Sequence, residues 1–159
     1  MPKLDLSKVP VKSGTIYPPP YAAEVAGRSS LRLGDAGGLT QFGVNIVILA
    51  PGAKSSMRHW HSHEDEFVMI TQGECTMVLD AGPTIMRVGD CAAFPAGNTD
   101  GHNFINHTDT EARFMVVGTK APYEVATYSD VDLMVELSPG EKGRAHFTYK
   151  DGTDWVGPR

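Results

Sequence analysis

Cysteine is scarce in this 159-residue chain, which contains only Cys75 and Cys91. Two cysteines are too few for the disulfide framework that stabilises many small secreted domains. Both lie in apolar, strand-like stretches, so we expect two buried free thiols and a cytoplasmic protein, because thiols stay reduced in that compartment. A catalytic cysteine is the alternative.

Long apolar runs and basic clusters are also missing. No stretch approaches the roughly 18 uncharged apolar residues that span a bilayer, and no basic segment followed by an apolar one, as in a secretory signal, opens the chain. The formal net charge is −5, and the densest basic grouping, around Arg28 and Arg32, is sparse. Since nucleic-acid backbones are bound by basic patches, the sequence predicts neither a membrane nor a nucleic-acid partner.

Turn-forming residues, in contrast, are abundant. Glycine and proline together make up about 18% of the chain, against roughly 12% in average proteins, which favours many turns between short elements. The length suits one domain, which we divide into an N-terminal arm (residues 1–39) and a body (residues 40–159). Three successive prolines predict that residues 17–21 are extended, before a short helical turn over 21–26. We expect the arm to pack on the body or on a partner subunit.

Strand signals dominate from residue 40 onward. Runs of β-branched and apolar residues, each ended by turn residues, recur about every 8–12 residues, as in an antiparallel sandwich or barrel. The predicted strands cover residues 44–50, 67–71, 75–79, 84–88, 91–94, 102–106, 113–117 and 131–137, and a hairpin starts at 145–149 and turns at 151–152. The sequence therefore predicts an all-β domain.

Three of the six histidines lie within five residues of one another. In an extended segment alternate side chains share a face, so His59 and His61 can meet one metal ion while Trp60 faces the other side. Glu66 follows at the start of the next apolar run, and His102 opens a later strand. Imidazole with carboxylate suits a divalent transition metal (Fe, Mn, Ni, Co or Zn) better than Mg²⁺ or Ca²⁺.

The spacing around the first histidines resembles the first motif of the cupin superfamily, G-x5-H-x-H-x3,4-E-x6-G. The chain has Gly52, His59, His61, Glu66 and Gly73 in this order. Only the first gap departs from the motif, because it holds six residues instead of five.

The second cupin motif, G-x5-P-x-G-x2-H-x3-N, is also present. Gly89, Pro95, Gly97, His102 and Asn106 occupy its positions. The departure here is a gap of four residues, instead of two, before the histidine. The loop before His102 is therefore longer than the motif specifies.

The resemblance covers roughly residues 40–120 and implies a double-stranded β-helix, the cupin jelly-roll barrel, with an extended N-terminal arm. It also implies that His59, His61, Glu66 and His102 face the barrel interior as metal ligands. The stretches R-H-W-H-S and G-D-C-x-x-F-P-A-G are similar to those of compact single-domain cupins loosely described as sugar-phosphate isomerases.

Two alternatives to this site remain open from the sequence. A set of His61, His63 and Glu66 is possible but breaks the family spacing, and many cupin barrels have lost their metal. The isolated His107 and His146 are expected to be surface or packing residues.

Three functions are compatible with such a site. The leading hypothesis is a metal-dependent isomerase or epimerase acting on a small polar substrate such as a sugar or sugar phosphate, by proton transfer next to a carbonyl. The alternatives are an Fe(II)-dependent dioxygenase and a non-catalytic module that binds or senses a small molecule. The candidates for proton transfer are His63, Glu64, Asp65 and Asp100, and those for holding a phosphate are Arg87 and Lys54.

We also expect a homodimer. Trp60 and other aromatic residues on the outer face of the sheet would form an exposed apolar patch, and such patches usually mark an interface. An N-terminal arm exchanged between two subunits would cover them.

Overall fold

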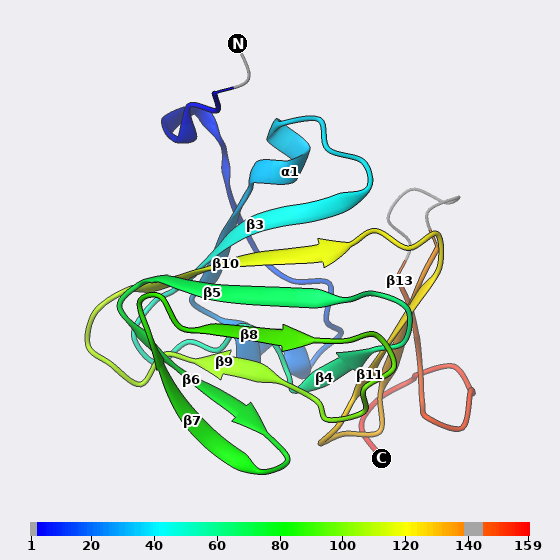
Figure 1. Cartoon of the computed structure of the whole chain (residues 1–159). Helices are drawn as coiled ribbons and strands as arrows, with labels where there is room; N and C mark the ends of the chain where they lie inside the picture. Colours follow the sequence, from blue (N-terminus) through cyan, green and yellow to red (C-terminus); the bar gives the residue numbers. More distant parts are fainter. Residues whose placement is uncertain (1–2, 139–144) are drawn as a thin grey trace.

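The computed structural model describes residues 3–138 and 145–159, whose strands form three antiparallel sheets. The largest sheet has the strand order β1-β2-β3-β10-β5-β8, and Figure 1 shows β3, β10, β5 and β8 side by side. Its strands are β1 (Val11–Ser13), β2 (Arg28–Arg32), β3 (Phe42–Leu49), β10 (Ala112–Thr119), β5 (Glu66–Gln72) and β8 (Cys91–Phe94).

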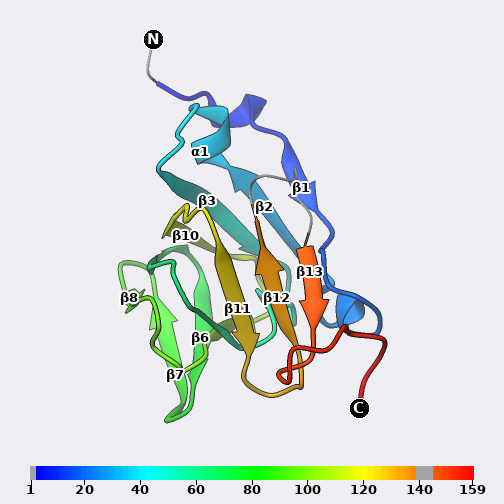
Figure 2. The ribbon, with the colours of Figure 1, turned by 90° about the vertical axis from the view of Figure 1, so that its right-hand side faces the viewer.

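The two smaller sheets form the opposite wall of the barrel (Figure 2). One consists of β13 (Ala145–Thr148), β12 (Met134–Leu137), β11 (Glu124–Tyr128) and β4 (His59–His61); the other of β7 (Gly82–Arg87), β6 (Glu74–Leu79) and β9 (Asn103–Ile105). A backbone bridge joins them: the N–H of His59 donates to the carbonyl of His102 at 3.1 Å, and the N–H of His102 donates back at 2.8 Å. The all-β jelly-roll barrel predicted from the sequence is confirmed.

Apolar side chains from both walls fill part of the barrel. The main core cluster includes Val47, Leu49, Val68, Ile70, Phe104 and Phe114. A second cluster, built on Tyr128, Leu133 and Val135, packs the sheet of β11 and β12 against Tyr21 of the N-terminal arm. The barrel is therefore closed by hydrophobic packing except where a cavity remains beside β4.

The N-terminal arm contributes to the barrel wall. Strand β2 pairs with β3 from Arg28 opposite Leu49 to Arg32 opposite Asn45, so the division at residue 39 falls within the sheet-forming part of the chain. The arm also contains the 3₁₀ turns η1 (Leu6–Lys8) and η2 (Tyr21–Val25) and the short helix α1 (Leu33–Ala36). The structure contains the helical turn expected over 21–26.

Two local expectations are wrong. The proline run is not extended throughout, because Pro20 adopts αR angles (φ −85°, ψ −7°) and the N–H of Ala22 donates to the carbonyl of Pro18 at 3.2 Å; the φ that proline fixes is compatible with a turn. Cys75 is buried as expected, but Cys91 is exposed, since it lies on β8, the outermost strand of its sheet.

Most of the predicted strands are present within one or two residues of the predicted ends. The strand predicted over 131–137 begins later, at Met134, and the predicted hairpin turns at Gly152 (φ +84°), whose N–H donates to the carbonyl of Tyr149 at 2.9 Å. Strands β1, β2 and β11 were not among the predicted strands, and β4 was expected only as an extended segment. No helix in the described part of the chain is long and apolar enough to cross a membrane.

Candidate metal centre

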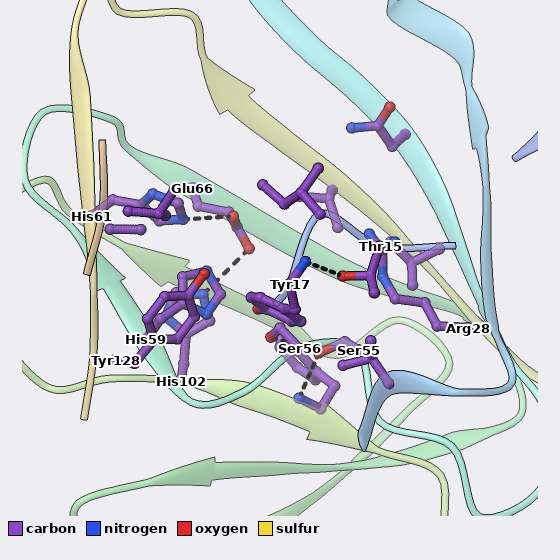
Figure 3. A pocket seen from close by; sticks show the side chains of 18 of the residues that line it. Thr15, Tyr17, Arg28, Ser55, Ser56, His59, His61, Glu66, His102 and Tyr128 are labelled. Atoms are coloured by element: carbon purple, nitrogen blue, oxygen red, sulfur yellow. Dashed lines mark hydrogen bonds and ion pairs between the residues drawn. The ribbon is translucent and has the colours of Figure 1, made fainter. Parts of the chain in front are cut away.

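Three histidines and one glutamate converge on the inner wall of the barrel (Figure 3). His59 and His61 leave β4 on the same face, and the backbone bridge places His102 beside His59. Nitrogen atoms of the three imidazoles lie within 4.8 Å of one another. Glu66, the first residue of β5, has its carboxylate 3.5 Å from Nε2 of His61 and 3.4 Å from Nε2 of His102. The structure thus brings together the four residues that the cupin motifs implied.

Polar groups on the far side of the rings orient two of the imidazoles, one through a hydrogen bond and one through a nearby carboxylate. Nδ1 of His59 donates to the carbonyl of Met57 at 2.9 Å, which leaves Nε2 to face the other members of the group. Nδ1 of His61 lies 3.6 Å from Oε1 of Glu124, a buried residue of β11. A carboxylate or carbonyl behind a histidine is the usual arrangement in metal sites, because it fixes the tautomer and the direction of the free lone pair.

His102 shows that the group fits a cation. Its ring stacks on Phe94 with centroids 3.6 Å apart, and both its nitrogens are buried without a hydrogen-bond partner in the described structure. An unpaired buried polar atom costs about 1–3 kcal/mol, and a metal ion at Nε2 would remove part of that cost. Three imidazoles with one carboxylate are suitable ligands for Fe²⁺, Mn²⁺, Ni²⁺, Co²⁺ or Zn²⁺.

The charges of the group also favour a cation. Burial lowers the pKa of His59 to about 3, with a further contribution from the neighbouring imidazoles, so this ring is neutral. Burial alone would raise the pKa of Glu66, but its contacts with His102 and His61 outweigh this and hold the pKa well below the usual range. For His61, burial is outweighed by the carboxylates of Glu124 and Glu66, which raise the pKa to about 9. A metal ion binding there would therefore displace a proton.

The four residues lie on the wall of a cavity of about 550 Å³. Apolar side chains such as Phe104 and Phe114 line one part of it, and Tyr17 and Tyr128 lie close to the histidines. The rings of these two tyrosines meet edge to face, 5.4 Å apart between centroids. Burial raises the pKa of both hydroxyls, so they stay protonated at neutral pH.

The proposed proton-transfer residues lie elsewhere. His63 is exposed and packs its ring against Tyr123, so the alternative ligand set that includes it is not assembled. Glu64 lies near His61 and Glu124 and accepts from the N–H of Ala121 at 2.8 Å. None of the expected acid–base candidates lines the cavity: Asp65 accepts from the N–H of Ala96, and Asp100 from that of Asp80, both at 2.8 Å.

The two residues expected to hold a phosphate also lie outside the cavity wall. Lys54 forms an ion pair with Glu24, and Arg87 pairs with Glu74 at 3.1 Å. His107 and His146 are exposed, as expected. Sequence reasoning missed four residues that the structure places in or behind the site: Tyr17, Arg28, Glu124 and Tyr128. All four come from segments outside the cupin motifs, and only the proline run after Tyr17 and the sparse basic grouping at residue 28 gave any local signal.

Comparison with known proteins places this geometry in a family. The Cupin domain model matches residues 45–118. A crystal structure from Silicibacter pomeroyi DSS-3, described as a sugar phosphate isomerase from a cupin superfamily, is 54% identical, with a TM-score of 0.94 over 98% of this chain and 97% of that chain.

Two more distant proteins also match this chain. Protein SchB of Streptomyces halstedii is 30% identical over 103 residues, which cover 64% of this chain and 72% of that protein. The polyketide cyclase RemF from Streptomyces resistomycificus is 20% identical, with a TM-score of 0.60 over 75% of this chain and 79% of that chain, and it supports the fold alone. On its motifs, its barrel and these relatives, the chain belongs to the cupin superfamily.

Proposed function

We propose that this cupin is a metal-dependent enzyme that isomerises a small polar substrate of the sugar-phosphate class. The observation that carries the proposal is the position of the His59, His61, His102 and Glu66 group on the wall of a cavity of about 550 Å³. Small-molecule sites usually have volumes of about 300–1,000 Å³ and combine apolar walls with a few polar groups. The 54% identical protein described as a sugar phosphate isomerase supports the choice of substrate class.

The chemistry follows from the ligand set. A divalent cation held by the four residues would supply a Lewis acid for a carbonyl oxygen. Together with a divalent ion, three neutral imidazoles and one carboxylate would give a net positive charge at that end of the cavity, which would attract electron-rich oxygen atoms. Tyr17 and Tyr128 present protonated hydroxyls beside the histidines and can donate hydrogen bonds to substrate oxygens. The surrounding walls limit the access of water to the reacting atoms.

Metal content is the first test. Untagged protein purified without chelator is expected to contain about one transition-metal ion per chain, measured by plasma mass spectrometry. His61→Ala and Glu66→Gln should lose most of it, while His146→Ala, a surface change, should keep it. A protein that takes up no metal from an excess of each candidate ion would contradict the proposal and favour a non-catalytic binding module.

Activity is the second test. The metal-loaded protein is expected to interconvert an aldose phosphate and its ketose phosphate, followed by NMR across a panel of three- to six-carbon substrates. The rate should be the same with and without oxygen. Turnover that requires both iron and oxygen would instead identify a dioxygenase.

The subunit arrangement and the location are part of the same proposal. We propose a homodimer, because Phe42 and Phe67 remain 40% and 38% exposed at an apolar groove of the barrel and large exposed apolar side chains often mark interfaces. We propose a cytoplasmic location because Cys75 and Cys91 are free thiols, which that compartment keeps reduced. Light scattering should give twice the mass of the 17.2 kDa chain; a mass of one chain would exclude the dimer.

A further inference from the structure

Arg28, the first residue of β2, lines the cavity without an anionic partner. The residue is half-buried, and its Nε is buried with no hydrogen-bond partner among the described residues. No ion pair within the described chain includes it. Burial lowers the pKa of this guanidinium, and the charge of Glu66 acts on it from across the cavity.

Other arginines of the described chain have close carboxylate partners. The pairs are Arg58 with Asp80 and Asp130, Arg87 with Glu74, Arg113 with Glu111, and Arg159 with Asp151. A guanidinium offers five N–H donors in a planar fork, and donors that are buried and unused cost free energy. Arg28 is therefore a cation with spare donors at a cavity wall, which an oxyanion in the cavity would satisfy.

The cavity has two ends of different chemistry. Figure 3 shows His59, His61, His102 and Glu66 at one end and Arg28 with Thr15 at the other. Hydroxyl groups of Ser55 and Ser56 lie between the two ends and are 3.2 Å apart. This lining suits a molecule with a hydroxylated middle and a charged end.

We propose that Arg28 binds an oxyanion, phosphate or carboxylate, on the end of the substrate opposite the metal centre. The inference rests on the proposed function for the identity of the other end. Arginine forms bidentate, charge-assisted hydrogen bonds with both groups. Arg32 also lines the cavity and adds a second positive charge near the same end. Its own ion pair with Asp35 is loose, with 4.0 Å between the charged atoms. A cation on Glu66 would offset the attraction that this carboxylate now exerts on Arg28, so a filled metal site strengthens the need for an anion.

The test compares three ligands that share one carbon chain. Ribose 5-phosphate, ribonate and ribose are titrated by calorimetry into the full-length protein as purified and into Arg28→Gln, Arg28→Lys and Arg87→Gln. Arg87→Gln is the matched control, because that arginine is exposed and already paired with Glu74. Metal content is measured on every sample, and the titrations are repeated in the His61→Ala background.

The wild-type protein should bind at least one of the two anions at millimolar concentration or below, and more tightly than ribose. Arg28→Gln should weaken that binding by about tenfold or more, the effect of losing a hydrogen bond to a charged group. Arg28→Lys should recover part of the affinity because it keeps the charge, and Arg87→Gln should bind as the wild type does. Which of the two anions responds to Arg28 identifies the oxyanion.

Several results would overturn the inference: equal affinity for the anions and ribose, an Arg28→Gln variant that binds like the wild type, or a loss of metal in that variant. If Arg28→Gln does not fold, an Arg28→Lys variant with the affinity of the wild type for both anions and for ribose counts against it in the same way. The proposed function fails separately. If the protein never takes up metal, but its anion affinity still depends on Arg28 in the His61→Ala background, the proposed isomerase is refuted and the proposed anion site stands.

Discussion

Replacing Glu124 by glutamine is expected to weaken metal binding without touching a metal ligand. Glu124 is only 2% exposed. Its Oε1 accepts from the N–H of Ser62 at 2.8 Å, and its Oε2 accepts from the N–H of His63 at 2.9 Å. Oε1 also lies 3.6 Å from Nδ1 of His61. One buried carboxylate therefore fixes both the backbone that follows β4 and the ring of His61.

Glutamine keeps the size of the side chain but removes its charge and one acceptor. One of the two backbone N–H groups then faces an NH₂ group and loses its partner, at a cost of about 1–3 kcal/mol in the free energy of unfolding. The ring of His61 loses the carboxylate that orients it, and such changes behind a metal ligand typically weaken metal affinity by about 10- to 100-fold. That factor corresponds to about 1.4–2.8 kcal/mol of binding free energy.

Cobalt binding measures this effect directly. Co²⁺ is titrated against a competing chelator, and its visible absorption reports the dissociation constant and the geometry of the site together. Glu136→Gln on β12 is the matched control, because that carboxylate is partly exposed and 4.0 Å from a surface histidine, His146; its affinity should not change. A Glu124→Gln protein that is less stable but binds Co²⁺ as the wild type does would refute the orienting role and leave Glu124 as a purely structural residue.

Two further predictions concern groups outside the metal centre. Asn106 is fully buried, and its side chain donates to the carbonyls of Leu49 and Thr110 and accepts from the N–H and the hydroxyl of Thr108. At about 1 kcal/mol per bond, Asn106→Ala should lower the free energy of unfolding by about 4 kcal/mol. Urea unfolding measures this, and Asn98→Ala, at an exposed loop position, should change it by less than about 0.5 kcal/mol. A thiol reagent should modify Cys91 quickly and Cys75 only after unfolding, because Cys91 is exposed while burial raises the pKa of the Cys75 thiol to about 11; fast modification of both, read by mass spectrometry, would contradict the described packing.

The strands that the sequence predicted share a local cause, and those it missed do not. β3, β5 and β10 are runs of β-branched and apolar residues, whose burial on one or both faces suits a sheet. β2 reads Arg-Ser-Ser-Leu-Arg and has little strand propensity of its own. It forms because each of its residues pairs with β3, a contact made only once the intervening residues 33–41 have turned the chain back. Such strands depend on their neighbours, so local patterns do not reveal them.

The same division applies to the residues of the site. His59 and His61 could be predicted to share a face because strand side chains alternate, and the family motif added Glu66 and His102. Glu124 is 62 residues away from the backbone N–H that it accepts from, and no spacing rule connects the two. Arg28 was visible only as part of a sparse basic grouping, because its position at the cavity depends on the pairing of β2.

The longer loop before His102 shows why an altered spacing left the group assembled. The N–H of Gly97 donates to the carbonyl of His61 at 2.8 Å, which ties the start of the loop to β4. At its end, Gly101 passes so close to Ser129 that a Cβ atom there would collide with this side chain, and His102 then pairs with the backbone of His59. Both ends of the loop are thus held by backbone contacts, and the extra residues project between them, where the side chain of Asp100 accepts from the N–H of Asp80. Because backbone pairing and not loop length positions His102, inserting a further residue at 98–99 should leave metal affinity unchanged, whereas Gly101→Ala should weaken it together with the fold.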